Sequence, residues 1–457
     1  PRARHCAAVV DLGIRDRHEQ VGRWVENMPF DGLVFPEGLR LLARWQAGDA
    51  EARERLTEIF DAGLSGQLDE VFSRPAPQDA VNVCGSIDLL TLGIIFDLYG
   101  VTAEEFYKGD PERYVRAVML NLKLLGMRKV YLSWPVYGFT AEALGQEMIY
   151  SDRFSPGTDP GVALVDADNW QDMPPLDVTT GIPRILDETL SCYRRLTGFK
   201  PVLHLSAPYS LAADIFGQEH LITALTKDPA FVGRFLDHLS EVVLRPWIDH
   251  FFDQHPDGWV EFSDASGSPF FIGPGNCRDV AIGSIQRLVE GSRWGDRVYI
   301  ANYRGDYVTR AKKREGSSRR RSSGATEPEA VSLDDLFELK NSVCRGYVIR
   351  LADDRIPMPF YVEKAIQRGI PLFAGIGATE IDRNSIADVE AAARDLEVMS
   401  GEYVDAVRTV ANTISDDGYD GRVPPWPGTV YFEDVSAESS FQLIEVIVGT
   451  VLRDGAL

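Results

Sequence analysis

Eight short runs of β-forming residues alternate with longer amphipathic segments along most of this chain. This alternation predicts an α/β protein built as a (β/α)8 barrel, the TIM barrel, with an N-terminal helical extension. Strands that alternate with helices in this way imply right-handed crossovers between parallel strands. The length of 457 residues exceeds one ordinary domain but fits a single enlarged barrel of this type.

Residues 1–78 are predicted to be mostly helical. Within residues 37–72, apolar residues recur at a spacing of three to four, with charged residues between them. This pattern is typical of amphipathic helices. The sequence RPAPQ at 74–78 then interrupts the pattern, because proline disfavours helical conformation in the residue before it and cannot donate a helical hydrogen bond. We expect 1–78 to form an extension that either caps the barrel or mediates homodimerisation, and 79–457 to form the barrel.

The predicted strands of the barrel are short runs bounded by turn residues or helical patterns. Two of the intervening helical patterns are especially regular, at 228–255 and at 384–414. The eight runs lie at 79–88, 128–135, 200–208, 258–266, 298–301, 345–353, 370–378 and 428–436.

Residues 310–330 depart from the pattern, since they combine a basic cluster with Ser, Gly and Pro. That composition is typical of a solvated, flexible loop. In a barrel the loop would hang over the carboxyl ends of the strands. It is either a plain insertion or a lid or docking loop whose positive charge attracts an anionic ligand or an acidic partner.

Composition excludes several classes of function. The net charge of −22 argues against binding to nucleic acid or to an anionic membrane surface. No run of about 18 apolar residues suggests a membrane span, and charges at the N-terminus come too early for a secretory signal. The five cysteines form no CxxC pair, which favours a reducing cytoplasm and makes a structural zinc site hard to build.

Polar side chains gather where the predicted strands end, and catalytic groups of barrel enzymes come from those ends. Any one of them could be a helix cap, a surface ion pair or, for His204, a satisfied core histidine. Such individual structural roles do not easily explain why these residues gather at the ends of several strands. Burying a ring of polar groups opposes folding unless the groups pair with one another or bind a ligand. The residues are His204, Ser206, Glu261, Asp264, Asn302, Tyr303, Arg304, Asp306, Arg350, Asp353, Glu433 and Asp434.

Four stretches, at 142–162, 200–242, 259–276 and 370–378, together resemble the uroporphyrinogen decarboxylase superfamily in their order and spacing. This superfamily also contains corrinoid-dependent methyltransferases. The resemblance extends over residues 85–450, and it implies a (β/α)8 barrel in agreement with the strand pattern.

Two departures from the family pattern refine the expected activity. Uroporphyrinogen decarboxylases proper carry an Arg-rich first-strand motif and a histidine after the eighth strand, where this chain reads NVCGSID and VYFEDVS. The zinc-binding branch carries His-x-Cys after the fifth strand and a Cys on the eighth. Asn302-Tyr303-Arg304 and Glu433 or Asp434 hold those places here, and an arginine cannot ligate zinc.

The resemblance therefore implies a methyltransferase that depends on cobalamin but not on zinc, with no metal-ligating residues expected in the chain. It would move a methyl group between a corrinoid and tetrahydrofolate or a methylated small molecule. No cobalamin-binding DxHxxG motif occurs in the chain, so the corrinoid is expected on a partner protein.

The residue roles follow from the same resemblance. Asp264 and Asn302 would hydrogen-bond a pterin, and Asp353 or Glu433 would relay protons. Arg304 and Arg350 would bind anionic groups. The rest of the expected substrate site consists of His204, Tyr303, Asp306 and Tyr150.

Three alternatives remain open from the sequence. A demethylase for a methoxylated or otherwise methylated small molecule would need an aromatic pocket, which Tyr131, Trp134, Tyr137 and Tyr150 could supply. A lyase related to uroporphyrinogen decarboxylase is the second alternative. A non-catalytic barrel that binds a tetrapyrrole or a partner protein is the third, since one fold hosts many functions.

Overall fold

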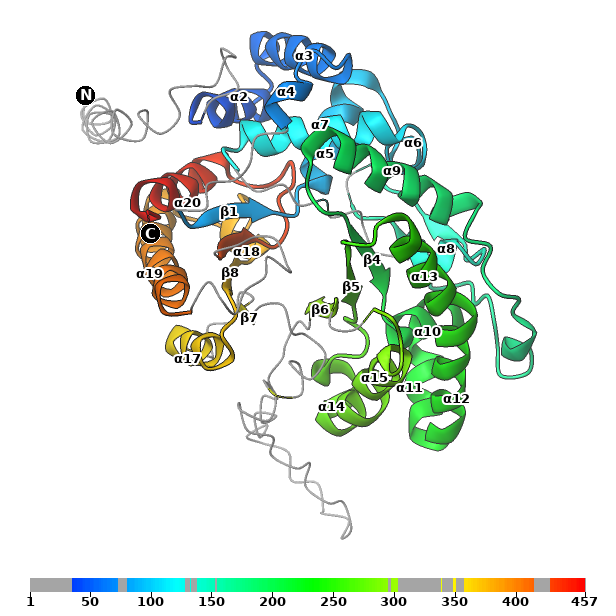
Figure 1. The fold of residues 1–457 in the computed structure, drawn as a ribbon. Helices are drawn as coiled ribbons and strands as arrows, with labels where there is room; N and C mark the ends of the chain where they lie inside the picture. Colours follow the sequence, from blue (N-terminus) through cyan, green and yellow to red (C-terminus); the bar gives the residue numbers. More distant parts are fainter. Residues whose placement is uncertain are drawn as a thin grey trace, which may run out of the picture.

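The arrangement of the chain is given by a computed structural model (Figure 1). It describes residues 35–72, 80–127, 132, 138–152, 154–294, 297–302, 338, 348–350, 357–414 and 428–456.

Seven of the eight predicted strands lie within the described residues, and every pair that they form is parallel. One sheet has the order β1-β9-β8-β7 and the other the order β4-β5-β6. Apart from Leu132, the run predicted as the second strand lies outside the described residues. The strands are β1 Asn82–Gly85, β4 Val202–Ser206, β5 Trp259–Ser263, β6 Val298–Asn302, β7 Val348–Arg350, β8 Leu372–Ile376 and β9 Thr429–Phe432.

The first and last of these strands are direct neighbours. Cys84 of β1 pairs in register with Tyr431 of β9, and an antiparallel bridge joins Ala80 to Ala456 just beside them. A barrel requires such a pair, because its sheet closes on itself. Figure 1 shows helices outside both sheets, as the predicted fold class demands. The complete ring of eight strands stays a prediction.

The helices between the strands begin and end at residues suited to those positions. Asp49, Asp110 and Asp388 accept hydrogen bonds from backbone N–H groups of the first turns of α3, α7 and α19. Gly100 closes α5 with a φ of 66°. The helices are α5 Asp88–Tyr99, α6 Ala103–Lys108, α7 Pro111–Leu124, α8 Phe139–Glu142, α9 Gly181–Thr197, α10 Pro208–Phe216, α11 Gln218–Lys227, α12 Pro229–Leu239, α13 Arg245–Gln254, α14 Pro269–Asn276, α15 Gly283–Val289, α17 Met358–Arg368, α18 Ala378–Ile381, α19 Val389–Thr413 and α20 Phe441–Asp454.

Smaller elements complete the described chain. The 3-10 turn η1 spans Trp170–Asp172, and the π-helical turns η2 Ser240–Leu244 and η3 Cys277–Ile282 adjoin α13 and α15. A short antiparallel hairpin of β2 Met148–Ile149 and β3 Gly157–Thr158 was not predicted from the sequence. No helix in the described part of the chain has both the length and the apolar character needed to cross a membrane.

The N-terminal segment is helical in α2 Glu37–Gln46, α3 Ala50–Leu64 and α4 Asp69–Phe72, as its amphipathic pattern predicts. α2 packs against α20, and α3 packs against α7. The division of the chain at residue 78 stays a prediction, as does the flexible basic loop at 310–330, which lies outside the described residues.

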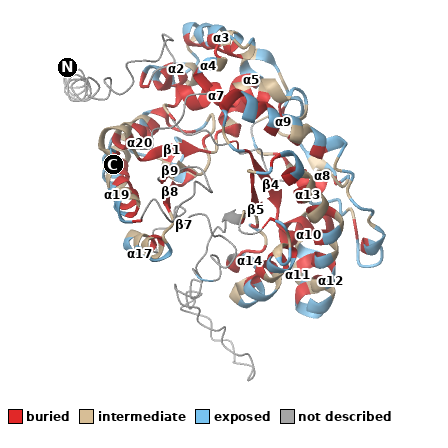
Figure 2. Ribbon diagram, viewed as in Figure 1, coloured by how far each residue is buried: buried red, intermediate tan, exposed pale blue. Residues whose placement is uncertain are grey.

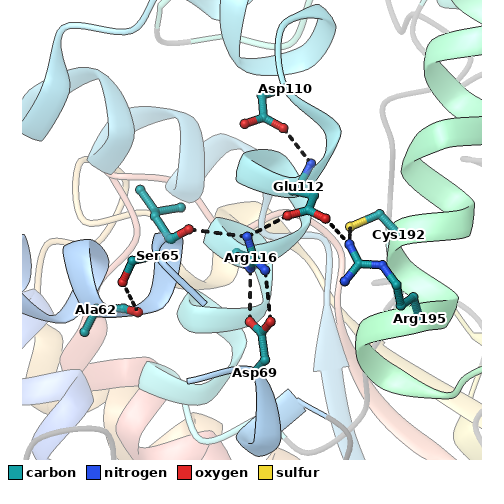
Figure 3. Close-up of polar contacts among 9 residues, drawn as sticks. Ala62, Ser65, Asp69, Asp110, Glu112, Arg116, Cys192 and Arg195 are labelled. Atoms are coloured by element: carbon teal, nitrogen blue, oxygen red, sulfur yellow. Dashed lines mark hydrogen bonds and ion pairs between the residues drawn. The ribbon is translucent and has the colours of Figure 1, made fainter. Parts of the chain in front are cut away.

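A network of ion pairs attaches this segment to the helices around the sheets (Figure 3). Arg116 of α7 binds Asp69 of α4 with two nitrogens, Nε to Oδ1 at 3.0 Å and Nη2 to Oδ2 at 2.9 Å. Its Nη1 donates to Glu112 Oε2 at 2.7 Å, and the other oxygen of Glu112 accepts from Arg195 of α9. The Arg116 side chain at the centre of this network is only 14% exposed, so its contacts are less screened by solvent than those of the outer partners Glu112 and Arg195, which are 44% and 53% exposed.

The two faces of the sheets have different chemistry. Leu203, Leu205, Val260 and Phe262 point to one face, are fully buried and belong to the apolar core shared with the helices. The alternate residues of β4 and β5, including His204, point to the opposite face, which we call the inner face. Figure 2 shows the strands buried and the exposed residues mainly on the helices. The inner face is therefore enclosed by protein and yet carries polar groups.

Candidate functional site

A histidine and a glutamate lie side by side on the inner face of β4 and β5. His204 and Glu261 are in register, and Nδ1 of the histidine is 3.6 Å from Oε2 of the glutamate. The two residues are only 7% and 8% exposed. The distance is too long for a hydrogen bond but within ion-pair range. When His204 carries a proton, the glutamate therefore stabilises its charge.

Asp264 follows β5 directly and is completely buried. Its Oδ1 accepts a hydrogen bond from Ser210 Oγ of α10 at 2.8 Å and from the Gly267 N–H at 3.2 Å. Ser210 Oγ in turn accepts from the Ser266 N–H at 3.3 Å. A buried carboxylate needs such donors, because desolvation without them costs several kcal/mol, roughly. The turn after β5 is therefore built around this carboxylate.

Two buried hydroxyls accompany Asp264. The side chains of Tyr209, at the start of α10, and Ser268, in the turn after Asp264, have no hydrogen-bond partner in the part of the chain that the structure describes. Both residues are 0% exposed. Burial and, second, the nearby Asp264 carboxylate raise the pKa of Tyr209, so its hydroxyl stays protonated. Both groups can donate a hydrogen bond that the described protein does not use.

α10 also carries Asp214, whose carboxylate accepts a hydrogen bond from Ser206, the last residue of β4. Burial raises the pKa of Asp214 to about 7, and the bond from Ser206 opposes that rise. The backbone N–H of Ser206 donates to Thr140 Oγ1 of α8 at 3.0 Å. The end of β4 is thus fixed from two sides.

A second acidic group lies where β1 and β9 end. Asp88 begins α5 and is 5% exposed, and it accepts a hydrogen bond from the Tyr114 hydroxyl of α7. Burial raises the pKa of Asp88 to about 7; the Tyr114 bond lowers it, and the charge of Asp434 raises it. Its titration is therefore coupled to a second carboxylate at the end of the neighbouring strand.

The loops that hold these two carboxylates are joined through their backbones. Ser86 donates its N–H to the Phe432 carbonyl at 3.1 Å, and its own carbonyl accepts from the Val435 N–H at 2.8 Å. The positions of Asp88 and Asp434 are therefore set together.

The structure locates some of the predicted residues and not others. His204 lies in the middle of β4, in register with Glu261 of the neighbouring β5, and Asp264 follows the end of β5. Asn302 ends β6 in register with Ser263, and Arg350 ends β7 in register with Ala374. The structure describes the backbone of Asn302 and Arg350 but not their side chains. Glu433 follows β9 and donates its N–H to the Ile376 carbonyl at 2.9 Å. Tyr303, Arg304, Asp306 and Asp353 lie outside the described residues.

Tyr150, the remaining predicted substrate contact, lies beside the β2–β3 hairpin. Its hydroxyl donates to Glu142 Oε2 of α8 at 2.6 Å, and Lys108 Nζ of α6 stands 4.8 Å from the centre of its ring. Lys108 also pairs with Glu142 at 2.6 Å. Of the aromatic pocket suggested by the sequence, Tyr131, Trp134 and Tyr137 lie outside the described residues.

Sequence reasoning missed Asp88, Tyr114, Ser210 and Asp214. A signal existed for two of them. Asp88 comes directly after the first predicted strand, and Asp214 is the one charged residue in the apolar helix PYSLAADIF. No group of three His, Cys, Asp or Glu side chains in the described ranges is placed to hold a metal ion. Since residues 303–337 are not among those ranges, zinc independence stays a prediction.

Comparisons with known proteins give a likeness in structure only. No protein-family model matches the chain, and neither does any curated protein. A methyltransferase from Methanosarcina mazei superimposes with a TM-score of 0.57 at 13% identity, over 85% of this chain and 96% of that one. The likeness shows the fold. It is a mixed α/β fold of the TIM-barrel type, which fits the fold expected from the uroporphyrinogen decarboxylase resemblance.

A B12-independent methionine synthase from Shewanella sp. W3-18-1, in complex with selenomethionine, gives a TM-score of 0.42 at 12% identity. The alignment covers 84% of this chain and 94% of that one.

Proposed function

We propose that this protein is a methyltransferase. It moves a methyl group between a corrinoid, carried by a separate protein, and tetrahydrofolate or a methylated small molecule, and it does so without zinc. The supporting observation is a set of buried polar groups at the strand ends of a fold similar to that of a methyltransferase over 85% of this chain. Barrel enzymes place their catalytic groups at those ends.

The donor and acceptor groups on and just after β4 and β5 suit a flat heterocycle. A carboxylate such as Asp264 or Glu261 accepts hydrogen bonds from two neighbouring N–H groups, which is what the amino-pyrimidine edge of a pterin offers. The hydroxyls of Tyr209 and Ser268 can each donate a hydrogen bond to a ligand, because no described protein group accepts one from them. A corrinoid held by its own protein needs no cobalt ligand from this chain, and when bound it supplies or accepts the methyl group through its cobalt.

Proton transfer accompanies methyl transfer to or from a heteroatom, and Asp88 is suited to it. A general acid or base works best when its pKa is near the working pH, and the pKa of Asp88 is about 7. Tyr114 holds the carboxyl in place by its hydrogen bond. We propose that Asp88 and Asp434 take part in the proton relay expected of Glu433 and Asp353.

The other assignments are part of the same proposal. Asn302 orients the heterocycle together with Asp264, and Arg304 and Arg350 bind its anionic groups. The substrate site also includes His204, Tyr303, Asp306 and Tyr150.

The decisive experiment is an anaerobic assay with methylcobalamin and tetrahydrofolate, in which the cobalamin spectrum is followed. We expect loss of the methylcobalamin bands only when tetrahydrofolate is present, and slower loss in Asn302→Ala and Asp264→Asn. Asp97→Asn, which makes the same charge change at the far end of α5, is the control. Folded protein that leaves the spectrum unchanged would rule out the folate reaction. Inactivity toward methoxylated compounds and methylated amines with reduced cobalamin as well would contradict methyl transfer and favour a lyase.

A further inference from the structure

Asp214 is exceptional on its helix. Eight of the nine residues of α10 are buried, and Asp214 is the one that is partly exposed. It is also the only residue of α10 with a charged side chain. A carboxylate contributes nothing to the apolar packing of such a helix, and its desolvation opposes folding.

The neighbours of Asp214 direct it to the carboxyl ends of the strands. Ser210 and Asp214 are four residues apart and so lie on the same face of α10. Ser210 binds Asp264 after β5 at 2.8 Å, and Asp214 accepts from Ser206 at the end of β4. The helix face that carries Asp214 is therefore the face that meets the predicted active site.

Ser206 is well placed to orient this carboxyl. It is 3% exposed, and Thr140 of α8 accepts its backbone N–H at 3.0 Å. The titratable groups on β4 and β5 and directly after β5 are His204, Glu261 and Asp264, and none of them contributes to the shift in the pKa of Asp214. Burial is the main cause that raises its pKa to about 7, so the carboxyl is substantially protonated at neutral pH.

We propose that Asp214 is a catalytic acid, which delivers a proton to the heteroatom that loses the methyl group. This inference rests on the proposed function. The bond between the methyl carbon and the heteroatom breaks, and its electron pair stays on the heteroatom. That atom takes the proton of the Asp214 carboxyl, while the electron pair of a reduced corrinoid forms the new bond to the methyl carbon. In the reverse direction the Asp214 carboxylate takes the proton back.

An acid in this place selects a class of methyl donor. An oxygen of a methyl ether, or a neutral amine nitrogen such as that of a methylated pterin, leaves as a strong base and needs a proton. A quaternary ammonium leaves as a neutral amine and needs none. The donor is therefore a methyl ether or a neutral methylated amine.

The first test needs no activity. Protein labelled with ¹³C at Asp carboxyls is titrated by NMR, and the Asp214 signal is assigned by its absence in Asp214→Asn. We expect a midpoint near pH 7 that moves upward in Ser206→Ala, because the hydroxyl bond stabilises the charged form. A midpoint below pH 5, or no response to Ser206→Ala, would overturn the inference.

The second test compares two methyl donors, 2-methoxyphenol and tetramethylammonium, with reduced cobalamin as acceptor. Asp214→Asn should lower kcat on the ether by about 100-fold or more with KM little changed, and Asp214→Glu should restore part of it. Asp237→Asn is the control, since that residue pairs with Arg287 on exposed helix surfaces. Equal rates for wild type and Asp214→Asn would refute the acid role.

The two tests separate the possible failures. If the wild type demethylates neither donor nor methyltetrahydrofolate, the proposed function fails and the acid role fails with it, whatever the titration shows. If the wild type is active on tetramethylammonium alone, methyl transfer stands and the inference about Asp214 is wrong.

Discussion

The carboxylate of Asp264 lies directly on the backbone of Gly267, so that a β-carbon at Gly267 would stand 2.4 Å from Oδ2. No real β-carbon tolerates that distance, and the atoms in the way are those of a buried, hydrogen-bonded carboxylate. Glycine at 267 is therefore required by the position of Asp264 and not by backbone conformation.

Gly267→Ala should displace the Asp264 carboxylate and break its bonds to Ser210 and to the backbone. We expect the free energy of unfolding to fall by about 1–3 kcal/mol, because a buried acceptor loses its donors. Methyl transfer should fall as well. Urea denaturation measures the first effect. Gly233→Ala is the control, since a β-carbon there meets nothing within 4 Å; a similar loss in both variants would contradict this account.

Asp88 should make the protein less stable as the pH rises. Its pKa of about 7 in the folded state lies above the value near 4 of an unfolded chain, so its contribution is full below pH 4 and is lost as the pH rises through 7. Asp88→Asn keeps an acceptor for Tyr114 and removes the charge. The difference in free energy of unfolding between the variant and the wild type should therefore be larger at pH 8 than at pH 5, by roughly a few kcal/mol in favour of the variant. Urea denaturation at both pH values measures this gain, and Asp97→Asn should show none.

His255 should act in the opposite direction, at acidic pH. It is 4% exposed, and neither ring nitrogen has a hydrogen-bond partner among the described residues. Burial, and then the charge of Arg194, lower its pKa. Its folded pKa therefore lies below the ordinary value near 6.5, and stability should fall as the pH drops from 6.5 toward the folded value. His255→Phe should weaken this dependence of the melting temperature, and the exposed His220→Phe should leave it unchanged.

Arg116→Lys should loosen the attachment of α4. A lysine keeps the charge but cannot bind both oxygens of Asp69, and the side chain is only 14% exposed. Amide hydrogen exchange in α3 and α4 should accelerate, with a stability loss of about 1–3 kcal/mol. Arg184→Lys is the matched control, because its pair with Glu188 is 58% and 48% exposed. Equal exchange in the two variants would show that the network does not hold these helices.

Local pattern was enough to predict the seven strands that the structure describes in the two parallel sheets, because each is a short apolar run whose type does not depend on distant residues. The sequence also located His204 on its strand and Asp264 directly after the next one, as the structure has them, while the roles expected of both residues stay predictions. Asp88 and Asp214 were missed because their importance comes from burial and from partners on other elements, such as Tyr114 of α7. The β2–β3 hairpin was missed because two residues per strand leave no period to detect.

The pairing of β1 with β9 has a consequence for synthesis. The strand at 82–85 leaves the ribosome long before residues 429–432 exist, so its neighbour on that side is missing during most of translation. Until then its edge exposes backbone groups that other chains could pair with. Contacts between residues so far apart in the sequence also slow folding. A nascent chain of this protein therefore has a long interval in which a chaperone would protect β1.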